Sequence, residues 1–271
     1  MKEIKRYLDN RIGDYSFCFE DLSSSYVYAH DENVVMTAAG CMKLPIAIAL
    51  LKSIENNHIS LRDNVNISDE DMVYGHGIIH EFGAREYSVE ELMIAMLIQS
   101  DNTAANKIIE TLGIISINET IKEMGLKNTL LNRKTIDKRI NKGNVENLST
   151  SADLSKCWRI LSNGGFLNKD NSHKLINILK RQQIKDKIPF YMPEDIKFNV
   201  ASKSGDLKGI ENDTALITTT KGNFTFTIMS RNLPNNIYGA VTITRIGKMV
   251  WDMIANDFYY DEVDVTSDFI L

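Results

Sequence analysis

The segment Leu44–Ile54 constrains the fold most strongly, because it is apolar around nearly its whole circumference when it is wound as a helix. A helix at a protein surface keeps a polar stripe, whereas a helix that is apolar on all sides lies buried. We therefore expect this segment to form a central helix inside the protein. The chain has 271 residues, enough for one large domain or two intertwined lobes with a sizeable core.

Strands are expected near both ends of the chain, on either side of a long helical region. The spacing of Ile4, Leu8 and Ile12 predicts an opening helix over residues 2–12. Alternating segments rich in Thr, Ile and Phe are typical of strands. The five predicted strands are Tyr15–Leu22, Tyr26–His30, Phe198–Ser202, Asp213–Thr220 and Asn223–Arg231.

The region between the two groups of strands, residues 37–187, is expected to be mostly helical. Its predicted helices include Glu90–Ile98, Thr103–Leu112 and Ser151–Ser162, and a last helix of the chain is predicted over Val241–Asn256. The pattern predicts an α+β fold, with a five-stranded antiparallel sheet flanked by terminal helices and an all-helical lobe. We expect residues 1–36 and 188–271 to form the α/β lobe, residues 37–187 the helical lobe, and the active site to lie in the cleft between them.

Composition and charge narrow the class of protein. The net charge of −5 argues against a nucleic-acid binder, which usually carries a basic patch. No apolar run approaches the roughly 18 to 20 residues that span a bilayer. The first residues show no apolar signal-peptide core, so the protein is expected to be cytoplasmic, or else to begin after a removed leader. Three cysteines without metal-like spacing, Cys18, Cys41 and Cys157, are interpreted as reduced thiols.

Three short motifs carry the candidate chemistry. They are Ala39-Gly40-Cys41-Met42-Lys43 at the start of the apolar helix, Ser100-Asp101-Asn102 after a helix, and Lys203-Ser204-Gly205 at the end of a strand. Positions three apart share one face of a helix, so residue 40 faces the Lys43 amine. A partly desolvated lysine can lose its proton near neutral pH and then act as a base. Backbone N–H groups at the helix N-terminus favour negative charge developing at the same place.

In this order, the motifs resemble the S-x-x-K, S-D-N and K-T-G signature of class A β-lactamases and penicillin-binding proteins. The resemblance covers nearly the whole chain and implies a serine acyl hydrolase that needs no metal or organic cofactor. It implies an oxyanion hole made by the N–H groups of Gly40 and Asp206. Ser100 would relay a proton to the leaving nitrogen, and Asn102 would bind the acyl-amide of the substrate. Lys203 and Ser204 would hold its carboxylate.

Two positions depart from the family pattern. Gly40 stands where the family has its nucleophilic serine, and glycine has no side chain to react. Cys41 does not replace it, because one residue along a helix is rotated by about 100° from the Lys43 face. We interpret Gly40 as an engineered Ser→Gly change, the alternative being a natural pseudoenzyme. If Arg133 begins the loop of the family's E-x-x-L-N glutamate, Thr135 occupies the glutamate position, and Asp137 and Glu146 lack the right spacing.

Each motif also has a structural alternative. Lys43 would be a buried lysine paired with a carboxylate, the Ser100 motif only a helix cap, and the Lys203 motif a strand end and turn. The segment Tyr74–His80 is interpreted as a loop at the cleft rim, in preference to a metal site, because its two glycines disfavour a helix. Arg231 and Arg245 are interpreted as surface residues, although the family often places an arginine near the third motif.

Three functions are compared. The leading one is a β-lactamase-type acyl hydrolase whose substrate is a β-lactam or amide carrying a carboxylate. Its catalysis is impaired in this chain because residue 40 is glycine. The second is a related peptidase, esterase or transpeptidase acting on a cellular substrate, which the missing glutamate favours. The third is a non-catalytic protein that holds a ligand in the same cleft. In all three cases, neither a nucleic acid nor a membrane is expected as a partner.

Overall fold

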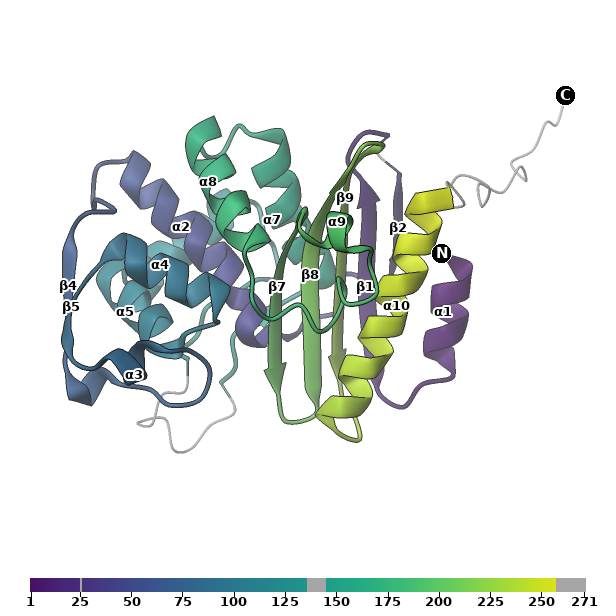
Figure 1. The fold of residues 1–271 in the computed structure, drawn as a ribbon, viewed down its shortest axis with the longest axis horizontal. Coiled ribbons are helices and arrows are strands. Elements are labelled where there is room, and N and C mark those ends of the chain that lie inside the picture. The colour runs from purple at the N-terminus through teal and green to yellow at the C-terminus, as the bar shows by residue number, and fades with distance from the viewer. Residues whose placement is uncertain (25, 136–144, 257–271) are drawn as a thin grey trace, which may run out of the picture.

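The computed structural model describes residues 1–24, 26–135 and 145–256 and has an α+β fold, as predicted (Figure 1). Its main sheet has five antiparallel strands in the order β2-β1-β9-β8-β7. The strands are β1 (Asp14–Asp21), β2 (Val27–His30), β7 (Val200–Leu207), β8 (Ile210–Thr219) and β9 (Gly222–Arg231). The first strand of the chain, β1, therefore pairs with the last, β9, and this pairing joins both ends of the chain in one sheet.

The two faces of this sheet pack against different helices, because side chains alternate along each strand. Phe17 of β1 and Phe226 of β9 belong to a core that also contains Ile4 and Ile246. These last two come from the terminal helices, α1 (Lys2–Asp9) and α10 (Asn236–Asn256). The opposite face carries small polar residues and meets α7 (Ser151–Asn163), whose Trp158 Nε1 donates to Thr214 Oγ1 at 2.7 Å. The sheet is thus covered on both faces.

The other helices form a second group beside the sheet, at the left of Figure 1. The helix α2 (Lys43–Glu55) is central in it, and every residue from Lys43 to Leu51 is buried. This confirms the expectation from its all-round apolar sequence. The other helices of this group are α3 (Ile79–Phe82), α4 (Val89–Ile98), α5 (Asn102–Leu112), α6 (Ile114–Glu123) and α8 (Lys169–Lys180). The short helix α9 (Glu194–Lys197) lies instead over the sheet, where Ile196 packs against the core that contains Phe17 and Ile246 (Figure 1).

Short elements that were not predicted interrupt this helical region. Two small two-stranded sheets pair β3 (Met36–Thr37) with β6 (Leu148–Ser149) and β4 (Asn64–Ile67) with β5 (Arg85–Ser88). Two 3₁₀ turns occur, η1 (Ala39–Met42) and η2 (Asp69–Asp71). The division into lobes at residues 36 and 188 stays a prediction. No helix in the described ranges is long and apolar enough to cross a membrane.

Several predicted boundaries were wrong. The opening helix ends at Asp9, so Ile12 does not join Ile4 and Leu8 and is 64% exposed. The last helix begins five residues earlier than expected, at Asn236. The strand predicted over 198–202 begins at Val200 and continues to Leu207, because pairing with β8 extends through Leu207 and Ile210.

Candidate active site

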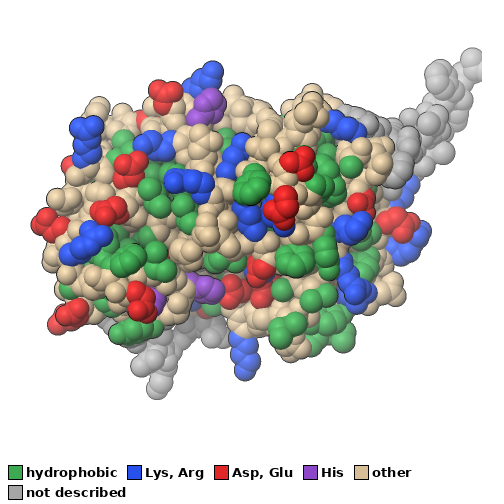
Figure 2. Space-filling view, viewed as in Figure 1, with side chains coloured by type: hydrophobic (Ala, Val, Ile, Leu, Met, Phe, Trp, Pro, Cys, Tyr) green, Lys and Arg blue, Asp and Glu red, His purple; other side chains and the backbone are tan. Residues whose placement is uncertain are grey.

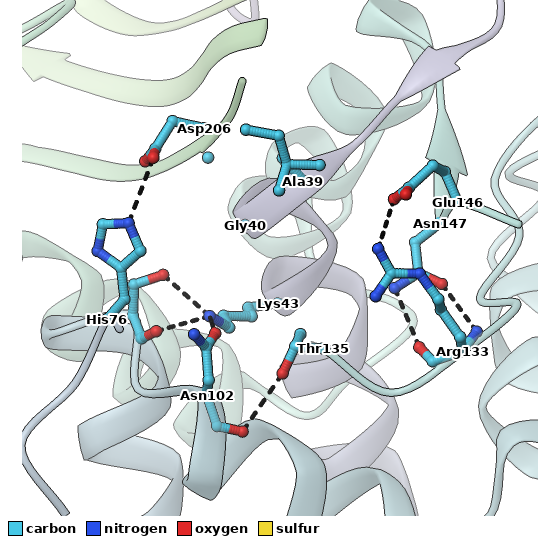
Figure 3. Close-up of a pocket in the computed structure, with 13 residues that line it drawn as sticks. Ala39, Gly40, Lys43, His76, Asn102, Arg133, Thr135, Glu146, Asn147 and Asp206 are labelled. Atoms are coloured by element: carbon cyan, nitrogen blue, oxygen red, sulfur yellow. Dashed lines mark hydrogen bonds and ion pairs between the residues drawn. The ribbon is translucent and has the colours of Figure 1, made fainter. Parts of the chain in front are cut away.

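A pocket between the start of α2, the start of α5 and the edge strand β7 contains much of the predicted site (Figure 3). It is also lined by the loop before α3 and by residues on either side of the undescribed segment 136–144. Of the predicted residues, the pocket wall includes Gly40, Lys43, Ser100, Asn102, Gly205 and Asp206. Lys203 and Ser204 lie directly behind this wall and are almost completely buried.

Gly40 lies in the 3₁₀ turn η1, and Lys43 is the first residue of α2. The expectation that one α-helix carries both residues was therefore wrong in detail. In a 3₁₀ turn, residues three apart lie directly above one another, so both still face the pocket. Ala39, just before the glycine, has a φ of 48°, a left-handed conformation that is costly for a residue with a Cβ.

The amine of Lys43 is buried and bonded only to neutral groups within the described residues. Its Nζ lies 2.6 Å from Ser100 O, 3.0 Å from Ser100 Oγ and 2.8 Å from Asn102 Oδ1. Burial and the nearby Lys203 ammonium hold the pKa of the Lys43 amine well below its usual range. A lysine neutralised in this way keeps a lone pair that can accept a proton. These contacts do not fit the alternative in which Lys43 is paired with a carboxylate.

The Ser100-Asp101-Asn102 motif divides its tasks between its residues. Asp101 is the N-cap of α5, since its Oδ1 accepts the Ala104 N–H at 2.8 Å. Its other oxygen, Oδ2, accepts the N–H groups of Ile78 and Ile79 at 2.7 and 2.8 Å. Ser100, with a φ of 54°, turns its hydroxyl to the lysines instead. Capping and contact with the site therefore coexist in one motif.

Lys203 approaches the same hydroxyl from the opposite side. Its Nζ donates to Ser100 Oγ at 3.1 Å and to Ser204 O at 2.8 Å, and burial lowers the pKa of Lys203 to about 8. The Lys203-Ser204-Gly205 motif lies inside β7 and not at a strand end, because Lys203 pairs with Thr214 and Gly205 with Asn212. The strand-end prediction, and with it the turn alternative, was wrong.

The edge of β7 packs closely on the turn that carries Gly40. A Cβ at Gly205 would overlap the backbone nitrogens of Gly40 and Cys41. A Cβ at Gly40 would lie 2.8 Å from Ser204 O, 3.0 Å from Gly205 Cα and 3.3 Å from Ser100 Oγ. A side chain at position 40 would thus point toward the Ser100 hydroxyl, but it requires the β7 backbone to shift.

Cys41 faces away from this pocket. It is buried against Met36, Leu154 and Met229, and its thiol donates to Lys203 O at 3.2 Å. Burial raises the pKa of the Cys41 thiol to about 12. The thiol is therefore not a reactive neighbour of Lys43. Like Cys41, Cys18 and Cys157 are buried and free.

The segment on either side of the undescribed residues forms another wall. The Arg133 guanidinium pairs with Glu146, with Nη2 2.7 Å from Oε2, and Thr135 Oγ1 donates to Asn106 Oδ1 at 2.8 Å. Thr135 lines the pocket, as does Glu146. Asp137, the other carboxylate considered from the sequence, lies outside the described residues.

Two residues gain importance only in the structure. His76, interpreted as part of a loop, faces Asp206 across the pocket with 3.3 Å between Nε2 and Oδ2, whereas His80 packs against Tyr74. Lys187 is buried behind β7 and pairs with Glu211 at 3.1 Å. No motif surrounds Lys187 in the sequence, so no local signal identifies it.

The two arginines considered from the sequence do not line the pocket. Arg231 pairs with Asp14 at 2.9 Å, on the exposed end of β9. Arg245 is an exposed residue of α10. Neither therefore holds a substrate carboxylate in this pocket.

The antiparallel sheet, the helices beside it and the lysine–serine cluster between them define the β-lactamase and penicillin-binding class. A family profile described as the "Beta-lactamase enzyme family" matches residues 1–254. A β-lactamase of Proteus vulgaris is 27% identical over 226 residues, which cover 80% of each chain. A β-lactamase of Citrobacter koseri is 33% identical over 90 residues, which cover 33% of this chain and 30% of that one. The chain belongs to the β-lactamase enzyme family.

Solved structures agree with this assignment. A β-lactamase from Sphaerobacter thermophilus superposes with a TM-score of 0.83 at 25% identity, covering 91% of this chain and 93% of that chain. The structure of PBP-A gives a TM-score of 0.85 at 22% identity, covering 94% of this chain and 95% of that chain. A mutant of PBP-A, solved as an acyl-enzyme complex with penicillin G, has the same TM-score and identity. At 22% identity, the likeness to PBP-A concerns the fold alone.

Proposed function

We propose that this fold is built for serine acyl hydrolase chemistry on a β-lactam or related amide, with residue 40 as the nucleophile position. The observation that carries the proposal is the convergence on Ser100 Oγ, where the amines of Lys43 and Lys203 lie at 3.0 and 3.1 Å. A Cβ added to Gly40 would lie 3.3 Å from the same oxygen. A hydroxyl there would have a base and a proton relay within reach.

The steps follow from this arrangement when a serine stands at position 40. The neutral Lys43 amine takes the hydroxyl proton, and the oxygen attacks the carbonyl carbon of the amide. The N–H groups of Gly40 and Asp206 are proposed to stabilise the oxyanion. Ser100 then gives its proton to the leaving nitrogen as the C–N bond breaks, and Lys43 returns a proton to Ser100. Water finally hydrolyses the acyl-enzyme.

Three residues are assigned to substrate binding. Asn102 would bind the acyl-amide, and Lys203 and Ser204 would bind a carboxylate beside the scissile bond. Lys203 is buried, so a carboxylate that it holds would be partly desolvated and the attraction correspondingly strong. The Ser100 hydroxyl contacts both lysines and would couple the binding of substrate to proton transfer.

Glycine at position 40 supplies no nucleophile to the site. We therefore infer that this protein binds substrate without forming an acyl-enzyme. Our interpretation remains an engineered Ser→Gly change that silences the enzyme. The close packing of Ser204 O and Gly205 Cα on position 40 favours the alternative of a natural ligand-binding protein, because a serine must displace the β7 backbone. The residue that the native gene encodes at this position decides between the two.

Turnover is a separate question from acylation. If Arg133 begins the loop that carries the family's glutamate, Thr135 stands at the position from which that glutamate activates water. Among the described residues, the carboxylates that line the pocket are Glu146 and Asp206, each in contact with a basic side chain. Slow deacylation is therefore expected even with serine restored. This favours the second enzyme function, a peptidase, esterase or transpeptidase acting on a cellular substrate.

Mass spectrometry with benzylpenicillin tests the proposal. The protein as written should show no covalent adduct, and the Gly40→Ser variant should gain the mass of one penicillin. Gly40→Ala is the matched control, because it adds the Cβ and its crowding without a hydroxyl. A lasting adduct on the protein as written, or none on a folded Gly40→Ser variant, would contradict the proposal.

A second assay separates the enzyme functions. The Gly40→Ser variant is compared on a chromogenic cephalosporin, on an ester and on a D-Ala-D-Ala peptide. Faster turnover of the peptide or ester indicates a cellular substrate, and faster turnover of the cephalosporin indicates a β-lactamase. Reversible binding by the Gly40 protein with no chemistry in the Gly40→Ser variant indicates a binding protein.

A further inference from the structure

His76 and Asp206 form a contact across the pocket that neither the motifs nor the proposed chemistry explain. His76 comes from the loop before α3 and Asp206 from β7, and Figure 3 shows the two side chains pointing toward each other. Their side chains are 49% and 36% exposed. The contact is therefore not enclosed by packing, and a ligand entering the pocket meets both groups.

Within the part of the chain that the structure describes, no lysine or arginine side chain bonds to the Asp206 carboxylate. Among the described residues, His76 is the one side chain that bonds to it. Lys187 and Lys203 act on the Asp206 carboxylate through space but do not bond to it: Lys203 donates to a hydroxyl and a carbonyl, and Lys187 pairs with Glu211. The carboxylate thus presents negative charge to the pocket.

The basic residues on the opposite wall of the pocket do not neutralise the negative charge of Asp206. Arg133 lines the pocket but pairs with Glu146 at 2.7 Å. Burial and the nearby Lys203 ammonium hold the pKa of the Lys43 amine well below its usual range, which weakens any contribution of Lys43 to the positive charge of the pocket. The hydrogen bond from His76 lowers the pKa of Asp206, so the carboxyl group is ionised at neutral pH. The ionised Asp206 carboxylate therefore favours a positive charge on the part of a ligand that reaches it, whereas Lys203 is assigned to the ligand's carboxylate.

We propose that Asp206 is a specificity-determining residue that selects an amide substrate carrying a protonated amine close to the scissile carbonyl. The amine would replace His76 on the carboxylate. A neutral ligand would cover the carboxylate without pairing it, and an anionic group at the same place would be repelled. This inference rests on the proposed function, since the N–H of Asp206 is assigned to the oxyanion. An amine on its carboxylate consequently lies near the acyl carbon.

Three penicillins that share the same bicyclic β-lactam nucleus and differ only in the charge of the side chain test the proposal. Benzylpenicillin has an uncharged side chain, ampicillin adds an amine at the α-carbon, and carbenicillin adds a carboxylate there. Their binding to the protein as written is measured by isothermal titration calorimetry at neutral pH, where Gly40 prevents acylation. Ampicillin should bind about fivefold more tightly than benzylpenicillin, and carbenicillin about fivefold more weakly, as expected for one partly exposed charge pair.

Two variants assign the effect to one residue. Asp206→Asn should bring the three dissociation constants to within about twofold, since the local charge is removed. Asp195→Asn, on the exposed surface of α9, makes the same change in net charge and should leave the order unchanged. His76→Ala should widen the preference for ampicillin, because the amine then meets no competitor on the carboxylate.

The outcomes separate this inference from the proposed function. Equal binding of the three penicillins by the protein as written would overturn the inference and leave the proposed function standing. Binding of none of them would overturn both. A preference that survives Asp206→Asn, or that narrows in His76→Ala, would also overturn the inference. The comparison of ligands on the unaltered protein decides the question even if a variant fails to fold.

Discussion

The side-chain amine of Lys43 lies 3.0 Å from the hydroxyl oxygen of Ser100, a residue 57 positions later in the chain. The first begins α2 and the second immediately precedes α5. Their contact joins two of the three motifs, and Lys203 joins the third from β7.

Lys43 should be required for acylation once a nucleophile is present. In the Gly40→Ser background, Lys43→Ala should slow the acylation rate by about 10² to 10⁴-fold, the usual loss for a general base. Lys248→Ala, which removes an exposed lysine of α10, is the control and should leave the rate unchanged. Stopped-flow measurement with a chromogenic cephalosporin gives the rate, and an unchanged rate in Lys43→Ala would rule out its role as base.

Binding of a carboxylate ligand should weaken as the pH rises through the pKa of Lys203. Burial lowers this pKa to about 8, so the ammonium is present below pH 8 and is lost above it. The dissociation constant of benzylpenicillin for the Gly40 protein should therefore rise above this pH, approaching about tenfold per pH unit. Lys203→Arg keeps its charge and should flatten the profile. If the dissociation constant of the unmodified protein stayed unchanged from pH 7 to 9, carboxylate binding by Lys203 would be refuted.

Ala39 should be a strained residue. Its φ of 48° places the backbone in the left-handed region, where a Cβ costs about 1 to 2 kcal/mol. Ala39→Gly removes this strain but adds entropy to the unfolded chain, so the free energy of unfolding should rise by about 0.5 to 1 kcal/mol. Ala47→Gly, inside the buried helix α2, should instead lower it by about 1 kcal/mol or more. Urea denaturation compares the two, and destabilisation by Ala39→Gly would show that no strain is stored there.

Asp101 should contribute more to stability than an ordinary helix cap. It caps α5 and also accepts the N–H groups of Ile78 and Ile79. Asp101→Ala should lower the free energy of unfolding by about 3 kcal/mol, combining a lost cap with two N–H groups left unpaired. The reference is Asn168→Ala at the exposed cap of α8, which should cost about 1 kcal/mol. Equal losses in the two variants would mean that the contact with the loop adds nothing.

Local chemistry made much of the fold and the motifs predictable. The apolar circumference of Leu44–Ile54 required a buried helix, and the alternating Thr and Phe residues near the C-terminus required strands. Element ends were less predictable. The end of β7 depends on its register with β8, in which Lys203 faces Thr214. Such pairing joins two strands across a turn, and the propensity of one strand by itself does not encode its register.

The sequence by itself determined which reactive side chains the protein has, and that residue 40 is not one of them. Only the tertiary structure decided what those side chains do to one another. It buries Lys43 beside Lys203 and thereby lowers the pKa of both amines, and it sets His76 opposite Asp206. It also closes β7 over Gly40. The reason is physical: hydrophobic patterning and backbone preferences act along neighbouring residues, whereas desolvation and Coulomb interactions depend on distances that only the packed chain defines.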